Sequence, residues 1–387
     1  MTESVYLNEL VDIYLGLTHT PEYVLDGVPF LSVKNISSGT IDFSQCNYIT
    51  EEEYNSLPNG AKPQCGDMLF CRVGTIGKPV IIEENTPRFG SFVSLGFFRV
   101  KDNNLCKLKY LYYWMYSESF YSQVRKNVKG ASQVNLNTGW LKNFRLPLYS
   151  LATQAEIVQK LEEVDRLIAL RKEQLAKLDE LVKSRFIELF GGADHPTVLF
   201  ENICVFLRNG ASIKQTKGAG GYPITRIETL SNDVFNIDRL GYADITDLEK
   251  YQSYVLHNGD VLISHINSVA YLGRAVQYRG QLDTPIIHGM NLLCARISDS
   301  YNPTYIEWFF KTPMAKEYIS TITKKAVNQA SITTSDLKKM QVPNPPKNLQ
   351  DQFAAFVEQT DKSKLAIQES LAELETLKKA LMQKYFG

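Results

Sequence analysis

The chain has 387 residues, of which 44% are hydrophobic and 22% charged, a composition typical of a soluble globular protein with room for two or three domains. Basic and acidic residues both number 42, so the net charge does not indicate a polyanionic partner. The six cysteines form no C-x-x-C pair and the five histidines lack metal-ligand spacing, so we expect a chain without bound metal. No apolar run approaches the ~18 residues of a membrane span. Because no signal peptide is recognisable either, we expect the chain in the reduced cytoplasm, away from membranes.

The first 150 residues predict an α/β region built from short strands. Apolar runs bounded by Gly, Pro and Asn indicate strands at 28–33, 67–72 and 80–82. The aromatic-rich stretch 110–116 predicts a short buried helix.

A long helix is expected next, from about 154 to 190. Thr153-x-x-Glu156 matches a capping box, which places the start of the helix at Thr153, and Gly191-Gly192 ends it. Its apolar residues follow the 4-3 spacing of a coiled-coil seam. The seam residues are Ile157, Leu161, Val164, Ile168, Leu175, Leu178 and Val182.

The second half of the sequence repeats the first, with an offset of 193 to 196 residues. The matched positions, in the same order in both halves, include Gly27 and Gly221, Asp67 and Asp260, Trp114 and Trp308, Gln154 and Gln350, and Phe190 and Phe386. Such an ordered series is difficult to produce by chance, and its period is too long for a solenoid. The repeat therefore predicts two similar domains related by a pseudo-two-fold axis.

A C-terminal helix repeats the central one. Asn348-x-x-Asp351 can cap it, and its seam keeps the same phase, with interruptions at Thr360, Lys364 and Lys378. Its seam residues are Phe353, Val357, Ile367, Leu371, Leu374 and Leu381. Either helix alone could simply pack on its own domain, but two helices of equal length favour pairing with each other.

These elements predict an α+β protein with two similar α/β domains and two long antiparallel coiled-coil helices. The expected domains are residues 1–149 and 192–346, and the expected helices are residues 150–191 and 347–387.

The tripeptide Asn344-Pro345-Pro346 raises an alternative, because Asn-Pro-Pro followed by an aromatic residue is the catalytic motif of DNA adenine methyltransferases. Here Lys347 replaces the aromatic residue, and no cofactor-binding glycine motif precedes it. The tripeptide aligns with residues 148–150, just before the central helix, so we interpret it as a helix-start linker. A stand-alone methyltransferase stays open as an alternative, as does a non-catalytic coiled-coil scaffold.

Polar loops at equivalent places in the two halves are candidates for binding. The stretch 129–138 matches 325–334, and 72–78 roughly matches 265–274. Arg, Asn, Gln, Ser and Thr side chains read base edges and contact phosphates, although each loop alone could be a surface turn. Charge is also uneven, since residues 1–60 hold nine acidic residues and one lysine, whereas 61–149 hold thirteen basic and five acidic residues. A basic second half suits phosphate contacts, but an ordinary charged surface explains it equally well.

Taken together, the chain resembles the specificity subunit of type I restriction-modification systems over nearly its whole length. The resemblance rests on the Gly-x-Pro strand, the Gly-Asp-x-Leu strand followed by Gly74-Thr-Ile-Gly77, the Gly130-Ala-Ser-Gln-x-Asn loop and the Phe-Gly helix ends, in an order that occurs twice. The second half departs from the pattern, because Ala326 replaces Gly130 and Gly74-Thr75 has no clear counterpart.

The resemblance implies a non-catalytic chain whose two target recognition domains each read one half of a bipartite double-stranded DNA sequence. Its helices would set the spacer and dock two methylation subunits, with restriction subunits joining through the complex. The chain itself would bind no cofactor, since S-adenosylmethionine and ATP are expected on the partner subunits.

The candidate DNA contacts are the polar and basic residues of the matched loops. They are Lys34, Asn35, Arg72, Thr75, Lys78, Lys129, Ser132, Gln133, Asn135, Asn137, Arg226, His265, Asn267, Ser268, Lys324, Lys325, Asn328, Gln329, Ser331 and Thr333. The DNA sequence that they read does not follow from residue types alone, because readout also depends on DNA shape.

Overall fold

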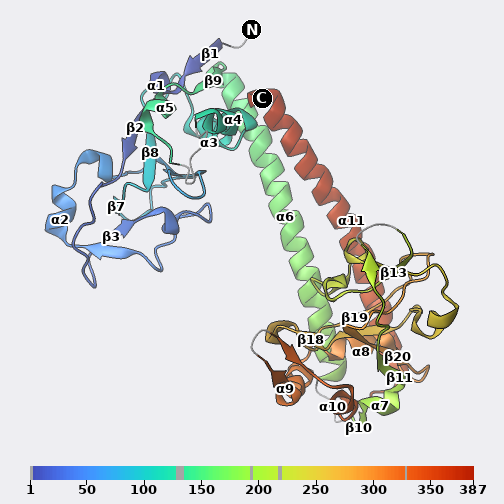
Figure 1. Cartoon of the computed structure of the whole chain (residues 1–387). Coiled ribbons are helices and arrows are strands. Elements are labelled where there is room, and N and C mark those ends of the chain that lie inside the picture. The colour runs from blue at the N-terminus through green and yellow to red at the C-terminus, as the bar shows by residue number, and fades with distance from the viewer. Residues whose placement is uncertain (1–2, 128–134, 192–194, 217–219, 327–328) are drawn as a thin grey trace. The chain divides into compact units, whose positions relative to one another are not determined.

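The computed structural model describes residues 3–127, 135–191, 195–216, 220–326 and 329–387 (Figure 1). The chain divides into two compact units: unit 1 is Met1–Glu173 with Gln368–Gly387, and unit 2 is Gln174–Ile367. Each unit contains one α/β region and about half of each long helix. Within the described ranges, no helix combines the length and apolar character needed to cross a membrane.

Unit 1 is built on a four-stranded antiparallel sheet with the strand order β2-β8-β5-β6. Its strands are β2 (Val11–Leu15), β8 (Leu95–Val100), β5 (Met68–Cys71) and β6 (Gly77–Ile81). Smaller sheets pair β1 (Glu3–Tyr6) with β9 (Arg145–Leu148), and β3 (Val28–Leu31) with β4 (Asn47–Ile49) and β7 (Gly90–Ser91). The helices are α1 (Leu7–Leu10), α2 (Glu51–Ser56), α3 (Leu108–Met115), α4 (Glu118–Asn127) and α5 (Thr138–Lys142).

Unit 2 repeats this topology, with a four-stranded antiparallel sheet in the order β11-β20-β17-β19. Its strands are β11 (Cys204–Asn209), β20 (Leu292–Ile297), β17 (Val261–Ser264) and β19 (Ala275–Gln277). The strand pair β10 (Thr197–Leu199) with β23 (Gln341–Pro343) corresponds to β1 with β9. The helices are α7 (Phe200–Ile203), α8 (Pro303–Phe309), α9 (Pro313–Ile322) and α10 (Thr334–Lys338).

Three small sheets complete unit 2. Their strands are β12 (Gln215–Thr216), β16 (Gly241–Ala243) and β13 (Tyr222–Ile224), then β14 (Leu230–Ser231) with β15 (Val234–Phe235), and β18 (Ile266–Asn267), β22 (Ala330–Ser331) and β21 (Lys324–Lys325). The two main sheets share one topology, as the repeat in the sequence predicts.

A buried ion pair anchors the main sheet of each unit. Asp67 makes two hydrogen bonds of 2.7 Å with Arg99, and Asp260 makes two of 2.8 Å with Arg296. Both carboxylates are 1% exposed, and each accepts one further backbone N–H. A buried carboxylate is stable only with such partners. The repeated Gly-Asp-x-Leu sequence is therefore a structural motif.

A buried glutamine on each long helix ties that helix to its α/β region. Gln154 accepts the backbone N–H of Lys107, and Gln350 accepts that of Asn302, both at 2.9 Å. Each glutamine also donates to the carbonyl oxygen five residues before it. The matched pair Gln154 and Gln350 thus fixes the start of each helix against the domain that precedes it.

The structure corrects one of the sequence matches. The hydroxyls of Tyr110 and Tyr305 donate to the proline carbonyls of β9 and β23, at 2.6 and 2.8 Å. Their offset of 195 residues places Trp114 opposite Phe309, and both side chains are buried. Trp308 lies one residue earlier and is only half-buried. The Trp114–Trp308 match is therefore one residue out of register.

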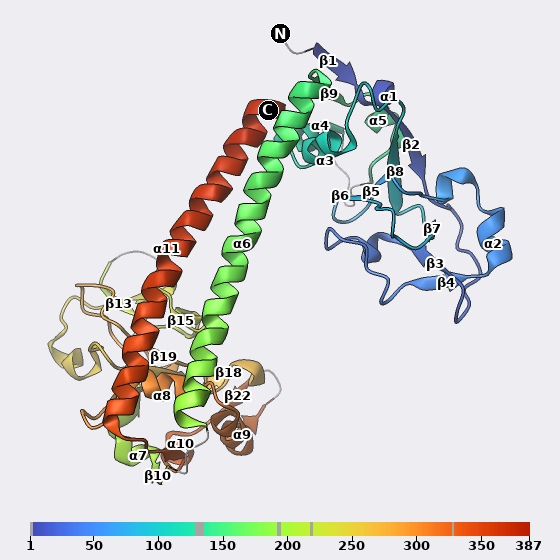
Figure 2. The same cartoon turned by 180° about the vertical axis from the view of Figure 1, so that it is seen from behind.

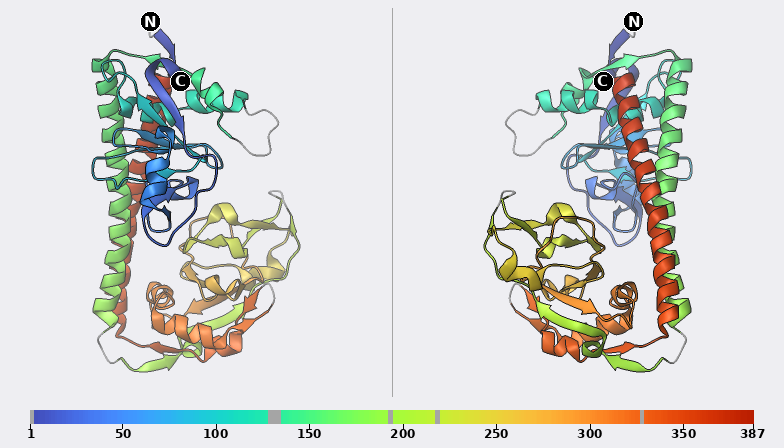
Figure 3. Two further views of the ribbon diagram at one scale, coloured as in Figure 1. Left: turned by 90° about the vertical axis from the view of Figure 1, so that its left-hand side faces the viewer. Right: turned by 90° about the vertical axis from the view of Figure 1, so that its right-hand side faces the viewer.

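The two long helices are α6 (Leu151–Phe190) and α11 (Lys347–Phe386), each of 40 residues. In each unit, a half of α6 lies beside a half of α11 (Figure 2 and Figure 3). All of the predicted seam residues are buried or half-buried, and exposed residues occupy most positions between them. The predicted seam is thus the face on which the helices pack.

Ion pairs across the seam give the direction of the helix pair. In unit 1, Lys378 pairs with Asp165 at 2.5 Å, and in unit 2, Lys364 pairs with Asp179 at 2.6 Å. Within unit 1, Lys172 of α6 also pairs with Glu375 of α11 at 3.7 Å, so the partners on α11 run backwards as α6 advances from Asp165, and the helices are antiparallel. The two lysines that interrupt the apolar pattern are accommodated in the seam by these carboxylates.

The predicted capping residues of the two helices are wrong by a few positions. Ser150 caps α6, because its Oγ accepts the backbone N–H of Thr153 at 3.3 Å, and Thr153 itself lies inside the helix. Pro346 precedes α11, so Asn348 also lies inside its helix. A Ser-x-x-Thr start was available in the sequence, but the later Thr-x-x-Glu pair matched the capping pattern more closely.

Candidate nucleic-acid interface

In unit 1, two candidate stretches that are far apart in the sequence come together. Val73 pairs with Asn135 in an isolated antiparallel bridge, and the N–H of Leu136 donates to the carbonyl of Arg72 at 2.9 Å. The turn after β5 and the residues before α5 therefore share one surface. Asn135 and Thr75 are exposed on it.

The Arg72 side chain stabilises this surface through hydrogen bonds to two backbone carbonyls. Its Nε donates to the carbonyl of Leu136 at 2.7 Å and its Nη1 to that of Val93 at 3.0 Å. Burial lowers the pKa of the Arg72 guanidinium from its ordinary value, although an arginine stays charged. The side chain expected to contact DNA is thus half-buried and holds the loop in place.

The turn from Gly74 to Gly77 presents the next candidates. Gly74 and Gly77 have φ values of +69° and +83°, and Lys78 has a φ of +48°, a left-handed conformation that costs energy for a lysine. A Cβ added to Gly77 would lie 3.0 Å from the hydroxyl of Tyr121. The glycines therefore form a tight turn that leaves Thr75 exposed and Lys78 half-exposed.

In unit 2, candidates from three segments meet on the small sheet β18-β22-β21. Asn267 lies opposite Ala330, and Lys325 lies opposite Ala330 from the other side. Lys324 lies opposite Ser331. Both lysines are exposed, whereas Asn267 and Ser331 are half-buried. This sheet combines two cations with short polar side chains, a set that suits contacts to phosphates and base edges.

His265 is not at the surface, in contrast to the prediction. Its side chain is 6% exposed, burial lowers its pKa below the ordinary value, and its Nδ1 has no hydrogen-bond partner within the described ranges. Its carbonyl accepts the N–H of Ile332 at 2.9 Å, as that of Arg72 accepts Leu136. His265 is therefore the counterpart of Arg72, and it holds the loop through its backbone carbonyl.

Two further candidates are helix caps. The side chain of Asn137 accepts the N–H of Gly139 at 2.7 Å at the start of α5, and Thr333 accepts that of Asp336 at 3.1 Å at the start of α10. Capping occupies an acceptor of each side chain. Their polar character follows from this structural role, which the sequence pattern does not distinguish from DNA contact.

Asn35 and Arg226 are also engaged within the fold. Asn35 is 6% exposed, and its Oδ1 accepts the N–H of Ser32 at 2.9 Å. Thr229 accepts the N–H of Arg226 at 2.8 Å in the equivalent turn, and the Arg226 side chain donates to Gln215 at 2.5 Å. Asn35 is thus a buried turn residue, and Arg226 is half-buried.

The remaining candidates divide into two groups. Lys34, Ser268 and Gln329 are exposed. The others lie outside the described residues, so their placement stays a prediction. They are Lys129, Ser132, Gln133 and Asn328.

Sequence reasoning missed two apolar residues beside the small sheet of unit 2. Val269 is 56% exposed and Tyr271 48% exposed, directly after Asn267 and Ser268. The candidate DNA contacts were chosen among polar and basic residues, so apolar side chains were not considered. Their position in the turn that follows β18, equivalent to the turn after β5, was the signal that could have identified them.

Two cysteines of the main sheets, Cys71 and Cys204, lie in surroundings that suppress ionisation of the thiol. Burial raises the pKa of Cys71 to about 11 and that of Cys204 to about 12, so both thiols stay protonated near neutral pH. In the part of the chain that the structure describes, no group of three or more His, Cys, Asp or Glu side chains could hold a metal ion.

Comparison with known proteins identifies the repeated unit. The family model of the type I restriction modification DNA specificity domain matches residues 19–180 and again residues 200–377. The putative type I restriction enzyme MjaX specificity subunit of Methanocaldococcus jannaschii is 37% identical over 187 residues, 48% of this chain and 44% of that protein. The EcoKI specificity subunit of Escherichia coli K12 is 22% identical over 412 residues, 96% of this chain and 85% of that protein.

Two solved structures share the fold. A chain from a structural study of complex assembly and conformational transition in the type I R-M system has a TM-score of 0.63 and 19% identity, with 99% of this chain and 97% of that chain covered. The type I restriction-modification S subunit from M. genitalium has a TM-score of 0.58 and 13% identity, with 100% and 96% covered. The alignment with the MjaX relative spans less than half of that protein's length.

Proposed function

Since the chain belongs to the family of type I restriction modification DNA specificity domains, we propose that it is the DNA-recognition subunit of a type I restriction-modification complex. Each unit reads one half of a bipartite double-stranded target. The observation that carries this proposal is a polar surface built at equivalent places in both units, after the strand whose other end holds the buried ion pair.

The two polar surfaces carry different side chains on main sheets of the same strand order. The difference in side chains favours two different half-sites. Thr75 in unit 1 has its counterpart near Ser268 in unit 2, and Asn135 has its counterpart at Ser331. The sheets beneath have the same strand order. Because base readout depends on donor and acceptor patterns, such differences change the sequence that is read.

Docking of two methylation subunits is supported by leucines on the outer faces of the long helices. Leu170 and Leu377 in unit 1 are 40% and 47% exposed, and Leu181 and Leu365 in unit 2 are 49% and 58% exposed. Exposed apolar side chains on paired helices suit further helices from a partner. Each unit offers one such pair, which matches two copies of the partner per chain.

Catalysis is assigned to those partners, which bring S-adenosylmethionine. The Asn344-Pro345-Pro346 tripeptide is a linker between β23 and α11: the N–H of Asn344 donates to the carbonyl of Pro196 at 2.8 Å, and the carbonyl of Pro345 accepts Gln350 at 2.9 Å. Pro345 is also buried. A flipped base is read by hydrogen bonds and by stacking, and the carbonyl of Pro345 is already occupied within the fold.

The test is methylome sequencing of cells that carry the matching methylation subunit, with and without this chain. We expect one bipartite methylated motif that depends on the chain. The double variant Lys324→Glu/Lys325→Glu should weaken DNA binding and reduce its salt slope by about one for each phosphate that is no longer neutralised. Lys250→Glu/Lys339→Glu, which changes the charge equally outside the small sheet, is the control. A motif that persists without the chain would contradict the proposal.

A further inference from the structure

Unit 2 contains a groove that the DNA surfaces do not account for. It lies between the C-terminal part of α6, the turn between β18 and β19, and helices α8 and α9, and it encloses about 480 Å³. Its floor is apolar and consists of Phe186, Ile187, Leu272, Trp308, Phe310 and Ile319. Ile187 is 66% exposed, so the floor continues onto an open apolar ledge. A groove of this size accommodates a few large side chains.

The rim of the groove is basic. Lys183, Arg274, Lys311 and Lys316 line it, together with a single carboxylate, Asp233. Arg274 pairs with Asp233 at 2.9 Å. Lys183 and Lys316 are exposed and make no ion pair within the described ranges. The rim therefore carries uncompensated positive charge on two sides of an apolar floor.

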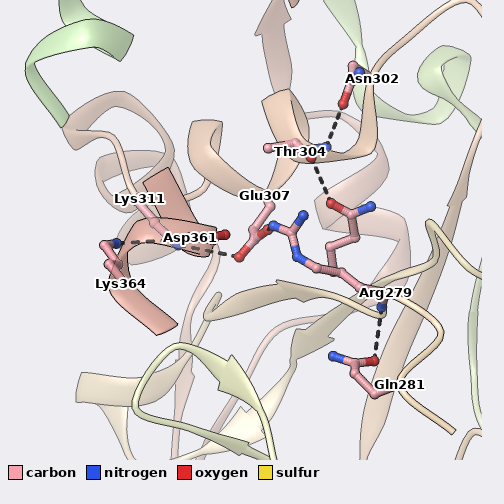
Figure 4. A network of polar contacts seen from close by, with 9 residues as sticks. Arg279, Gln281, Asn302, Thr304, Glu307, Lys311, Asp361 and Lys364 are labelled. Carbon is pink, nitrogen blue, oxygen red and sulfur yellow. Dashed lines mark hydrogen bonds and ion pairs between the residues drawn. The ribbon is translucent and has the colours of Figure 1, made fainter. Parts of the chain in front are cut away.

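A buried carboxylate fixes one wall of the groove. Glu307 is 5% exposed and holds Arg279 at 3.0 Å and Lys311 at 3.4 Å (Figure 4). Lys311 also lies over the ring of Trp308, 4.3 Å from its centroid. These contacts order Lys311 and Trp308 before any partner arrives, which lowers the entropy cost of binding.

Unit 1 keeps two of the four rim cations and lacks the other two. Lys379 and Lys78 occupy the positions of Lys183 and Arg274. With the offset of 195 residues that aligns α3 with α8, Tyr116 and Tyr121 occupy the positions of Lys311 and Lys316. Tyr121 is half-buried, and its hydroxyl lies 3.4 Å from the carbonyl of Ile76, against the turn that precedes β6. Lys311 and Lys316 are thus particular to unit 2, whereas the other two rim cations belong to the repeated scaffold.

We propose that the groove binds an acidic segment of another protein, with apolar side chains inserted on Phe186, Ile187 and Trp308 and carboxylates paired with Lys183 and Lys316. Positive charge around an apolar floor is the arrangement that recognises amphipathic acidic peptides. Because Lys311 and Lys316 have tyrosines at their positions in unit 1, the segment binds once per chain, in unit 2. An apolar floor does not suit a nucleic-acid backbone, whose contacts are polar.

The test uses the full chain and a fluorescein-labelled synthetic peptide that alternates glutamate with leucine and phenylalanine. Fluorescence anisotropy should report saturable binding. Lys183→Glu/Lys316→Glu should weaken it about tenfold or more, and Ile187→Glu should weaken it similarly, because they remove the charge and the apolar ledge separately. The control Lys250→Glu/Lys339→Glu should bind as the unchanged chain does. The same peptide with lysine in place of glutamate should not bind.

Several outcomes would overturn the proposal. One is equal binding by the groove variants and the control, and another is failure of the unchanged chain to bind the acidic peptide. Displacement of the peptide by duplex DNA, with DNA binding abolished in Lys183→Glu/Lys316→Glu, would assign the groove to the DNA surface. Self-association that disappears in the same variant would assign it to a second copy of the chain. Circular dichroism of each variant separates these results from loss of folding.

Discussion

Replacing Asp260 with Asn tests whether the repeated Gly-Asp-x-Leu sequence is structural. The carboxylate is 1% exposed and accepts two hydrogen bonds from Arg296 and one from the N–H of His257 at 2.8 Å. The Asn amide nitrogen is a donor, and it would face a donor from Arg296 or from His257. Removing one partner of a buried pair costs about 3–5 kcal/mol.

The expected loss for Asp260→Asn is smaller than that range. Arg296 is 26% exposed, so water reaches part of its guanidinium after the pair is broken. We therefore expect a decrease of about 2–4 kcal/mol in the unfolding free energy of unit 2. Asp67→Asn should produce the same effect in unit 1, because the geometry of its pair with Arg99 is equivalent.

Hydrogen exchange with mass spectrometry measures the two units separately. Amides of β11, β17 and β20 should lose protection in Asp260→Asn, while those of β2, β5 and β8 keep theirs, and Asp67→Asn should give the reverse pattern. Asp299→Asn, at an exposed acid, is the control. A loss below about 1 kcal/mol, or an equal loss in both units from one substitution, would refute the assignment of the motif to the core of its own unit.

Three other predictions follow from the helices, a buried histidine and the linker. A heptad inserted between Leu175 and Val182 lengthens α6 by ~10.5 Å. If the helices set the spacer between the half-sites, the spacer of the methylated motif should lengthen by up to ~3 base pairs. An active variant that keeps the original spacer would contradict this role of the helices. Burial lowers the pKa of His288 to about 4. As the pH falls, the unfolded state therefore takes up a proton before the folded state does. The free energy of unfolding should decrease by about 3 kcal/mol as the pH falls from about 6.5 towards 4. Denaturant titrations of His288→Gln should lack that component, and an unchanged pH slope would refute it. The isolated chain should give no calorimetric signal with S-adenosylmethionine, and saturable binding would count against the linker interpretation of Asn344.

The sequence predicted those features that depend on local pattern or on the repeat. The seam of the long helices follows from the 4-3 spacing of apolar residues, which does not depend on the rest of the fold. The match of Asp67 with Asp260 marked the two residues that anchor the main sheets. The cap of α6 at Ser150 was missed by three residues, because several polar residues in this stretch can each cap a helix.

The candidate surface was harder to predict, because polar residues serve two purposes. Asn137 and Thr333 cap helices, and Asn35 closes a turn, with the same side-chain groups that contact DNA. Arg72 and His265 lie at equivalent positions and are drawn inward by loops distant in sequence. Only tertiary contacts distinguish such residues from Thr75 or Lys325, which stay at the surface.

The central claim is that the two units read separate halves of one DNA target. Its most direct measurement is methylome sequencing after residues 196–346 are exchanged for the corresponding domain of another specificity subunit. We predict a new motif in which one half changes and the other half is retained. A motif in which both halves change, or neither does, would contradict independent reading by the two units.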